Sequence, residues 1–204
     1  MHLVSVDTPH GIAAVHLGLA AHPRGAVVLG HGAGGGVGAV DLVAVTRVAR
    51  ELGLSVALVE QPYRVAGRRA PPRAPVLDAS WVAVVARLRL DELAGVPLVV
   101  GGRSSGARVA CRTTTATGAT AVLCLAFPLL PPRRAGKPEA ASRLPELDGA
   151  GVPVLVVQGG RDPFGVPPGA PGRTVAVVAG DHSLKADLPA VEVAVREWLA
   201  ELPM

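Results

Sequence analysis

The sequence predicts an α/β fold of three layers, in which helices cover both faces of a mostly parallel central sheet. Two observations lead to this prediction. Short apolar runs typical of buried strands alternate with segments of helical periodicity, and half of the 204 residues are hydrophobic while 18% are charged. Such alternation is typical of parallel sheets, and the composition allows a sizeable core. Residues 1–204 contain no internal repeat and no interdomain linker, so we expect one domain.

Strands are predicted where short apolar runs end at a glycine or another turn residue. Leu3–Val6 and Ala13–Leu19 flank a turn near Pro9, so we expect them to form a leading hairpin or edge pair. Six further strands are predicted at Ala26–Leu29, Ser55–Val59, Pro97–Val100, Thr120–Phe127, Val152–Val157 and Thr174–Val178.

Helices are predicted where apolar residues recur at helical spacing. The first is Asp41–Leu52, which ends before Gly53. The second is capped by Asp78 and runs to about Leu93. The other two are Ser105–Thr117 and Ala186–Leu202. Two Pro-rich segments are interpreted as loops: Gln61–Pro75, and Pro128–Gly151, which has room for one or two helical turns and is too short for a full lid.

The charge balance does not favour a nucleic-acid partner. The formal net charge is +4, but 18 of the 20 basic residues are arginines spread along the chain. Only five residues are aromatic, so the chain lacks the stacking platforms that bind single strands. We therefore expect no nucleic-acid partner.

No segment has the features of a membrane span or a signal peptide. The longest apolar stretch, Ala121–Leu130, is broken by Pro128 and is shorter than the roughly 18 residues that a spanning helix needs. No basic residue precedes an apolar segment at the N-terminus. Cys111 and Cys124 are too few for a disulfide framework and lack metal-ligand spacing. We expect a cytoplasmic protein that does not associate with a membrane and binds no metal.

Residues 102–106 form a Gly-x-Ser-x-Gly motif between a predicted strand and a predicted helix. In this context the motif predicts a nucleophile elbow, a sharp turn that raises the Ser104 hydroxyl above the sheet. Side chains at Gly102 and Gly106 would clash in so sharp a turn. The N-terminus of the helix that follows stabilises the negative charge that develops during the reaction.

A serine needs a base that is oriented by an acid. Asp162 and His182 each follow a predicted strand, and the order Ser104, Asp162, His182 is that of a nucleophile, its acid and its histidine. Ser105 is the less favoured nucleophile because it lies one step into the helix. Asp181 is the less favoured acid because a side chain next to His182 does not easily face its imidazole; we interpret it as a loop-stabilising acceptor.

The Gly-rich loop at residues 30–36 has two interpretations. In a hydrolase, the backbone N–H of Ala33 or Gly34 would pair with that of Ser105 to form an oxyanion hole, and His31 would hold the loop by hydrogen bonds. The pattern Gly30-x-Gly32-x-x-Gly35, with Glu60 ending the next strand, also matches a dinucleotide fingerprint. The two predicted strands that precede this loop count against the second interpretation.

The chain resembles the α/β-hydrolase superfamily, more closely its small, lid-poor branch related to dienelactone hydrolases and to KANSL- and Tex-type hydrolase-like proteins. The similar segments are residues 30–36, 60–63, 101–108, 127–128, 158–165 and 180–183. The resemblance implies an α/β-hydrolase fold, with Ser104 as nucleophile, Asp162 as acid and His182 as base. It implies no metal and no dissociable organic cofactor. Val166–Gly172 departs from the family, because it replaces the helix usually found between the acid and histidine strands.

The favoured hypothesis is a serine hydrolase that cleaves an ester, thioester or related acyl bond of a small molecule through an acyl-enzyme. Substrate-binding candidates are Arg103 beside the nucleophile, and Arg64, Arg68 and Tyr63 in the Pro-rich segment. A monomer or weak homo-oligomer is expected. The alternatives are a non-enzymatic interaction module that keeps the fold and, less favoured, a dinucleotide-binding oxidoreductase.

Overall fold

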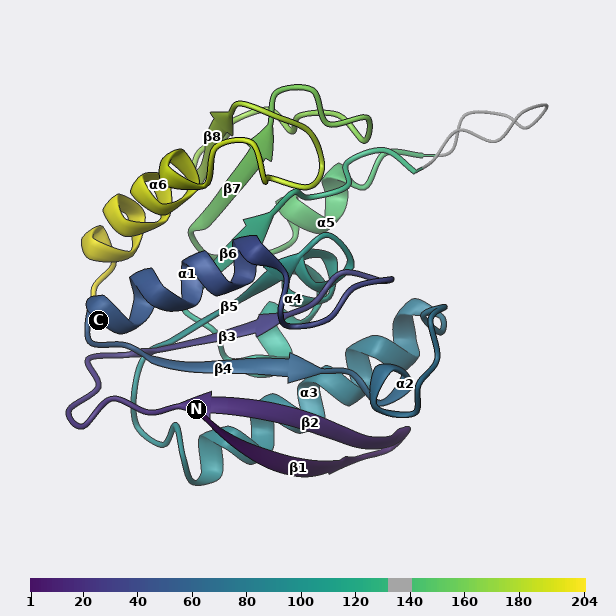
Figure 1. The fold of residues 1–204 in the computed structure, drawn as a ribbon, viewed down its shortest axis with the longest axis vertical. Helices are drawn as coiled ribbons and strands as arrows, with labels where there is room; N and C mark the ends of the chain where they lie inside the picture. Colours follow the sequence, from purple (N-terminus) through teal and green to yellow (C-terminus); the bar gives the residue numbers. More distant parts are fainter. Residues whose placement is uncertain (132–140) are drawn as a thin grey trace.

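A computed structural model describes residues 1–131 and 141–204, and within them the strands form one twisted eight-stranded sheet (Figure 1). The strand order is β1-β2-β4-β3-β5-β6-β7-β8. The strands are β1 His2–Thr8, β2 Gly11–Gly18, β3 Ala26–Gly30, β4 Ser55–Glu60, β5 Leu98–Arg103, β6 Ala121–Leu125, β7 Val154–Gly159 and β8 Arg173–Val178.

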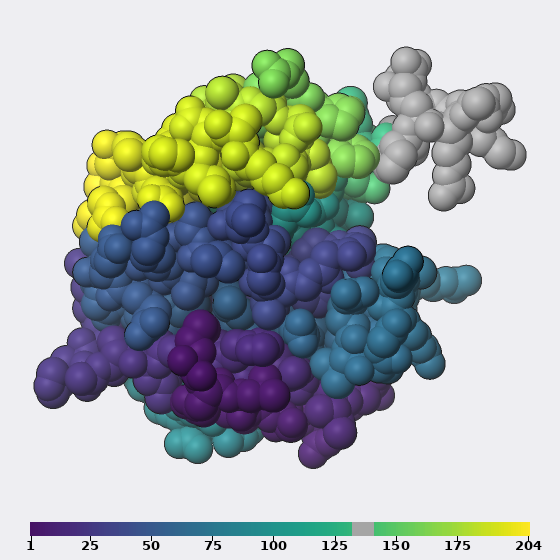
Figure 2. Space-filling view, in the orientation of Figure 1, coloured from purple at the N-terminus to yellow at the C-terminus, as the bar shows by residue number. Residues whose placement is uncertain are grey.

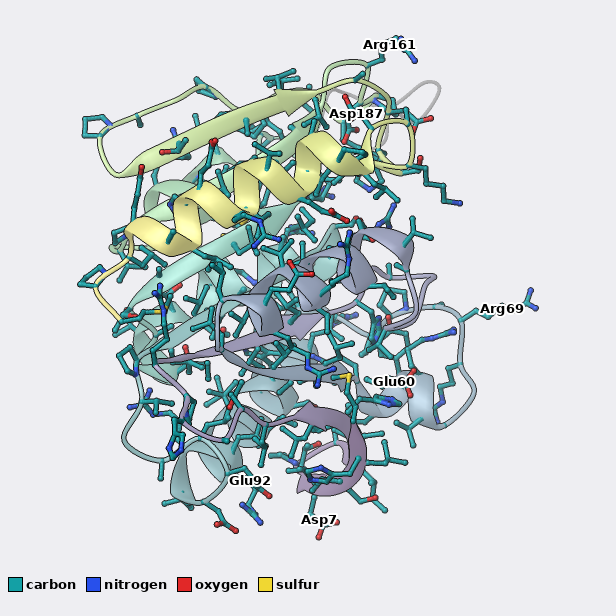
Figure 3. The ribbon with its side chains drawn as sticks, turned by 60° about the vertical axis from the view of Figure 1, so that its left-hand side comes forward. Asp7, Glu60, Arg69, Glu92, Arg161 and Asp187 are labelled. Carbon is teal, nitrogen blue, oxygen red and sulfur yellow. The ribbon has the colours of Figure 1, made fainter. Side chains whose placement is uncertain are left out.

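The six strands from β4 to β8 in this order pair in parallel, while the β1–β2 hairpin is antiparallel and adds to the edge at β4. Strands β3, β6 and β7 are buried along their whole length. Such strands need apolar side chains on both faces, which explains why their sequences are apolar except for Gln158 in β7. Parallel pairing also places the carboxyl ends of β3 to β8 at one edge, where Figure 3 labels Glu60 and Arg161.

Helices cover both faces of the sheet. Their bounds are α1 Val40–Glu51, α2 Pro62–Val65, α3 Ala74–Leu90, α4 Ser105–Thr117, α5 Leu144–Asp148 and α6 Leu188–Glu201. One face carries α1 and α6, which lie side by side in Figures 1 and 2 and are in contact. The other face carries α3, α4 and α5. Two apolar cores result, one on each side of the sheet, as the three-layer prediction requires.

The structure confirms the predicted fold class and corrects the start of one helix. Asp78 does not cap α3, because that helix begins four residues earlier at Ala74 with Pro75 in its first turn. Proline suits this position, since its fixed φ is already helical and the N–H that it lacks has no partner there. The carboxylate of Asp78 instead forms an ion pair with Arg112 of α4, at 2.6 Å. The Gln61–Pro75 loop likewise contains the short helix α2.

The described parts of the connections that follow β6 and β7 contain little helix. Between β6 and β7 the described residues contain only the one-turn helix α5, in agreement with the prediction of little or no lid; residues 132–140 of this predicted connection lie outside the description. Residues 160–172, between β7 and β8, form no helix, as expected. None of the described helices combines the length and hydropathy of a membrane span.

Candidate active site

Ser104 lies on the sharp turn between β5 and α4. Its backbone has φ 53° and ψ −108°, a conformation that side-chain-bearing residues rarely adopt. Its own N–H donates to the carbonyl of Leu125 at the end of β6, 2.8 Å away, which ties the turn to the neighbouring strand. Strain of this kind persists only where surrounding contacts enforce it, and it is typical of functional sites.

The glycines at both ends of the motif are required by a close approach to β3. A Cβ at Gly102 would lie 2.3 Å from the carbonyl oxygen of Gly30, and one at Gly106 would lie 2.4 Å from the same atom. Both distances are far below van der Waals contact. The predicted steric reason for the Gly-x-Ser-x-Gly pattern is therefore present, and the partner that imposes it is the end of β3.

Three side chains from separate turns meet above the sheet. The Nε2 atom of His182 lies 3.0 Å from the Ser104 Oγ, and its Nδ1 atom lies 2.7 Å from the Oδ2 of Asp162. A carboxylate accepts, so the network assigns the proton to Nδ1 and leaves the Nε2 lone pair to accept the serine O–H. The ring engages Ser104 rather than Ser105, which begins α4, and Asp162 rather than Asp181.

Asp162 is held as an acceptor of several hydrogen bonds. Its side chain is fully buried beside His182. Its Oδ2 also accepts from the Nε2 of Gln158 at 2.7 Å, and its Oδ1 accepts from the backbone N–H of Phe164 at 2.9 Å. The same amide nitrogen of Gln158 lies 3.1 Å from the carbonyl oxygen of Phe127 and 2.9 Å from that of Gly165, so its two N–H groups are shared among three acceptors. No role for Gln158 was predicted from the sequence, although an amide in an otherwise apolar strand is a signal that could have identified it.

The turn that carries His182 is anchored on both sides. Leu184 is fully buried in the core under α6 and adopts a positive φ of 53°. Asp181 Oδ1 accepts from the backbone N–H and the hydroxyl of Ser183, which lowers the pKa of Asp181; its predicted role as a loop acceptor is thus observed. The Phe164 ring packs against the imidazole in a T-shaped arrangement, with centroids 4.6 Å apart.

The Gly-rich loop at residues 30–36 is held by two aromatic side chains. His31 donates from Nδ1 to the carbonyl of Gly32 at 2.8 Å, and its Nε2 accepts from the backbone N–H of Gln61 at 3.1 Å. Burial lowers the pKa of His31, so the ring stays neutral and can accept. The Tyr63 hydroxyl donates to the carbonyl of Ala33 at 2.7 Å. These contacts fix the segment whose Ala33 and Gly34 N–H groups were predicted as oxyanion donors.

The predicted substrate-binding arginines have other surroundings. Arg64 of α2 donates to the carbonyl of Arg68 in the loop that follows, and Arg68 lines a cavity of about 660 Å³ between this loop and the β1–β2 hairpin. Neither Ser104 nor His182 lines that cavity. Figure 3 shows neighbouring Arg69 pointing away from the molecule. Arg103 is bound to protein groups on both sides, so the anion-binding prediction is not retained for it.

The geometry does not favour the dinucleotide interpretation. Two strands precede β3, and α1 begins only at Val40, so the glycines from Gly30 to Gly35 do not open a helix as the fingerprint requires. Among the residues that the structure describes, no group of three or more His, Cys, Asp or Glu side chains could hold a metal ion.

Comparison with known proteins gives one family. The family described as "Alpha/beta hydrolase domain" matches residues 23–188. No curated protein matches the sequence significantly.

Solved structures share the fold at low sequence identity. Est1E from Butyrivibrio proteoclasticus is 15% identical with a TM-score of 0.76, and the alignment covers 98% of each chain. The dienelactone hydrolase from Anabaena variabilis is 17% identical with a TM-score of 0.74, covering 98% of this chain and 96% of that one. XC6422 from Xanthomonas campestris, described as an α/β serine hydrolase without lid, is 20% identical with a TM-score of 0.71, covering 99% and 96%. The family match spans most of the chain and the architecture agrees with it: this protein belongs to the α/β-hydrolase family.

Proposed function

We propose that this protein is a serine hydrolase that cleaves an ester, thioester or related acyl bond through an acyl-enzyme. The observation that carries the proposal is the continuous contact from Ser104 Oγ to His182 Nε2 (3.0 Å) and from His182 Nδ1 to Asp162 Oδ2 (2.7 Å). The strained elbow and the family membership support it.

The reaction has two halves. In the first, His182 Nε2 takes the hydroxyl proton as Ser104 Oγ bonds to the substrate carbonyl carbon, and the imidazolium then protonates the leaving group as its bond to carbon breaks. In the second, His182 deprotonates a water that attacks the acyl carbon, and the proton returns to Ser104. Asp162 stays ionised throughout, holding the tautomer and stabilising the imidazolium.

The oxyanion of each tetrahedral intermediate is assigned to two backbone donors. One is the N–H of Ser105 at the first position of α4, where the helix itself leaves the group without a partner. The other is the N–H of Ala33 or Gly34 in the loop fixed by His31 and Tyr63. Loss of one such donor typically costs about 10²–10³ in rate.

The proposed substrates are short acyl esters, or a large molecule whose scissile bond lies at the surface. Support comes from the connection between β6 and β7, whose described part, residues 126–131 and 141–153, contains only the one-turn helix α5. Relatives of similar fold include the lidless XC6422, and Est1E has been solved with ferulic acid bound. A short acyl group would need no lid to cover it.

The test is labelling with a fluorophosphonate probe, followed by peptide mass spectrometry on the wild type and on Ser104→Ala. We expect an adduct on Ser104 that the variant lacks, and loss of ester turnover with nearly unchanged thermal stability. An ester chain-length series then tests the substrate class.

Absence of an adduct on folded wild-type protein, or turnover retained by Ser104→Ala, would contradict the proposal. The first result would favour the alternative that the sequence leaves open, a non-enzymatic interaction module that keeps the fold.

A further inference from the structure

Arg103, the residue directly before Ser104, joins three segments around the site. Its Nη2 donates to the backbone carbonyl of His182 at 2.9 Å, and its Nε lies 2.9 Å from the Oδ2 of Asp41 in the first turn of α1. Its Nη1 packs against the Gly-rich loop, because a Cβ at Gly32 would lie only 3.1 Å from it. One guanidinium therefore contacts the histidine turn, the Gly-rich loop and α1.

The partner carboxylate is fixed independently of Arg103. The Asp41 side chain is 1% exposed, and its Oδ1 accepts from the backbone N–H of Leu42 at 2.9 Å. Burial raises the pKa of Asp41, while the Arg103 charge opposes that rise and favours the carboxylate. Asp41 is therefore the fixed carboxylate of an ion pair that keeps the Arg103 guanidinium at this place, while the directional hydrogen bond of Arg103 is the one to the His182 carbonyl.

The contact to His182 is made to the backbone of the base itself. Arg103 and Ser104 are covalent neighbours, so a bond from the Arg103 side chain to the His182 carbonyl links the base to the chain that carries the nucleophile. The imidazole extends from the same residue toward Ser104 Oγ. An ammonium could not hold Asp41 and the His182 carbonyl in the same way, because only a guanidinium presents several donors in a fixed plane.

We infer that the Arg103–Asp41 pair is a positioning device that sets the distance between His182 and Ser104. The inference rests on the proposed function and adds two positioning residues to it. Arg103 acts through the backbone of His182, not by touching substrate. Misplacement of a catalytic group by about 1 Å can cost about 10²-fold in rate, which sets the size of the expected effect.

The first test compares Arg103→Met with a matched control, Arg112→Met. The Arg112 side chain is 19% exposed against 20% for Arg103, and it also pairs with an aspartate, Asp78, between α3 and α4 away from the site. Arg112 makes a second ion pair with Glu146 of α5, at 3.3 Å, so its removal should cost stability at least as readily. We expect Arg103→Met to lower kcat and the rate constant of Ser104 phosphonylation by roughly 10- to 100-fold, with a smaller change in KM. Arg112→Met should lower thermal stability and leave both rates unchanged.

Two further variants separate positioning from stability. Arg103→Lys keeps a positive charge near Asp41 but lacks the planar set of N–H donors of a guanidinium. Compared with Arg103→Met, its thermal stability should therefore recover more than its kcat. The double variant Arg103→Met with Asp41→Asn removes the buried unpaired carboxylate, and should likewise regain stability while its rate stays low. Equal loss of rate in Arg103→Met and Arg112→Met, or recovery of the wild-type rate by the double variant, would overturn the inference.

A readout independent of turnover keeps the inference testable if the proposed function fails. The His182 ring N–H that donates to Asp162 should give a strongly deshielded proton NMR signal, assigned by its loss in a His182 variant. We expect this signal to broaden and exchange faster with water in Arg103→Met, but not in Arg112→Met. A wild type that the probe does not label, with this spectral difference intact, would contradict only the hydrolase proposal. An unchanged signal in Arg103→Met would contradict the positioning role.

Discussion

At the scale of single residues, both carboxylate oxygens of Asp162 accept hydrogen bonds, so an amide NH₂ group cannot replace either of them without loss. Its Oδ2 accepts from His182 and Gln158, and its Oδ1 accepts from the Phe164 N–H. In Asp162→Asn, either orientation of the new NH₂ group would face another donor. Buried donors left without acceptors typically cost about 1–3 kcal/mol.

We therefore predict that Asp162→Asn lowers both activity and stability. An amide at the acid of a serine triad can cost about 10⁴ in kcat by stabilising the wrong tautomer. Ester turnover and urea unfolding measure the two effects. The control is Asp181→Asn, which keeps an oxygen for Ser183 and should change neither; an Asp162→Asn protein with wild-type turnover would contradict the assignment of the acid.

The buried His31 side chain should make the free energy of unfolding depend on pH. Burial lowers its pKa below 6.5 in the folded protein, as does the charge of Arg64, while the hydrogen bond to Gly32 and the charge of Glu60 act in the opposite direction. The unfolded chain therefore binds more protons than the folded chain between these two pKa values. This contribution to stability is present above pH 6.5 and is lost as the pH falls through 6.5 toward the folded pKa.

Urea unfolding between pH 5 and 8 measures this contribution. We expect the free energy of unfolding to fall toward low pH, and His31→Gln to make the fall less steep because it removes the titrating ring. His10→Gln, at an exposed position of the hairpin turn, is the control and should keep the wild-type slope. Equal slopes in the wild type and His31→Gln would contradict the prediction.

At the scale of elements, the contact between α4 and the end of β3 determines where the nucleophile lies. Gly106 permits that contact, since a methyl group there would lie 2.4 Å from the Gly30 carbonyl oxygen. Gly106→Ala should force α4 away from β3 and move Ser104 with it. We predict a loss of about 1–3 kcal/mol in stability, as for other overpacked sites, together with slower phosphonylation of Ser104.

Gly38→Ala is the matched control for this substitution. A Cβ at Gly38 meets nothing within 4 Å, so thermal unfolding and labelling should stay near wild type. A Gly106→Ala protein of wild-type stability would show that the helix and strand can separate without cost.

At the scale of the whole molecule, the fold brings together turns that are distant in the sequence. The β1–β2 hairpin adds to the parallel sheet at β4, and the carboxyl ends of β5, β7 and β8 carry Ser104, Asp162 and His182 to one edge. Two backbone hydrogen bonds fix the relative positions of the last two turns: Gly160 N–H donates to the carbonyl of Val178, and Arg161 N–H donates to that of Gly180. These contacts join β7 and β8 beyond their ends.

The sequence alone determined the layers, the approximate strands and the three candidate residues, because apolar periodicity and turn chemistry are local properties. Helix Ser105–Thr117 was predicted with its observed bounds. The start of α3 was not, because a proline in the first turn of a helix has the same local signature as one in a loop.

The partners of the polar side chains could be found only in the folded molecule. Nothing near Arg103 in the sequence indicates that its partners are Asp41 and the carbonyl of His182, since both come from segments that the fold brings to it. Likewise, His31 accepts from Gln61 because β3 and β4 pair side by side. Such contacts are set by the order and register of the strands, which depend on how the whole core packs and not on any short stretch of sequence.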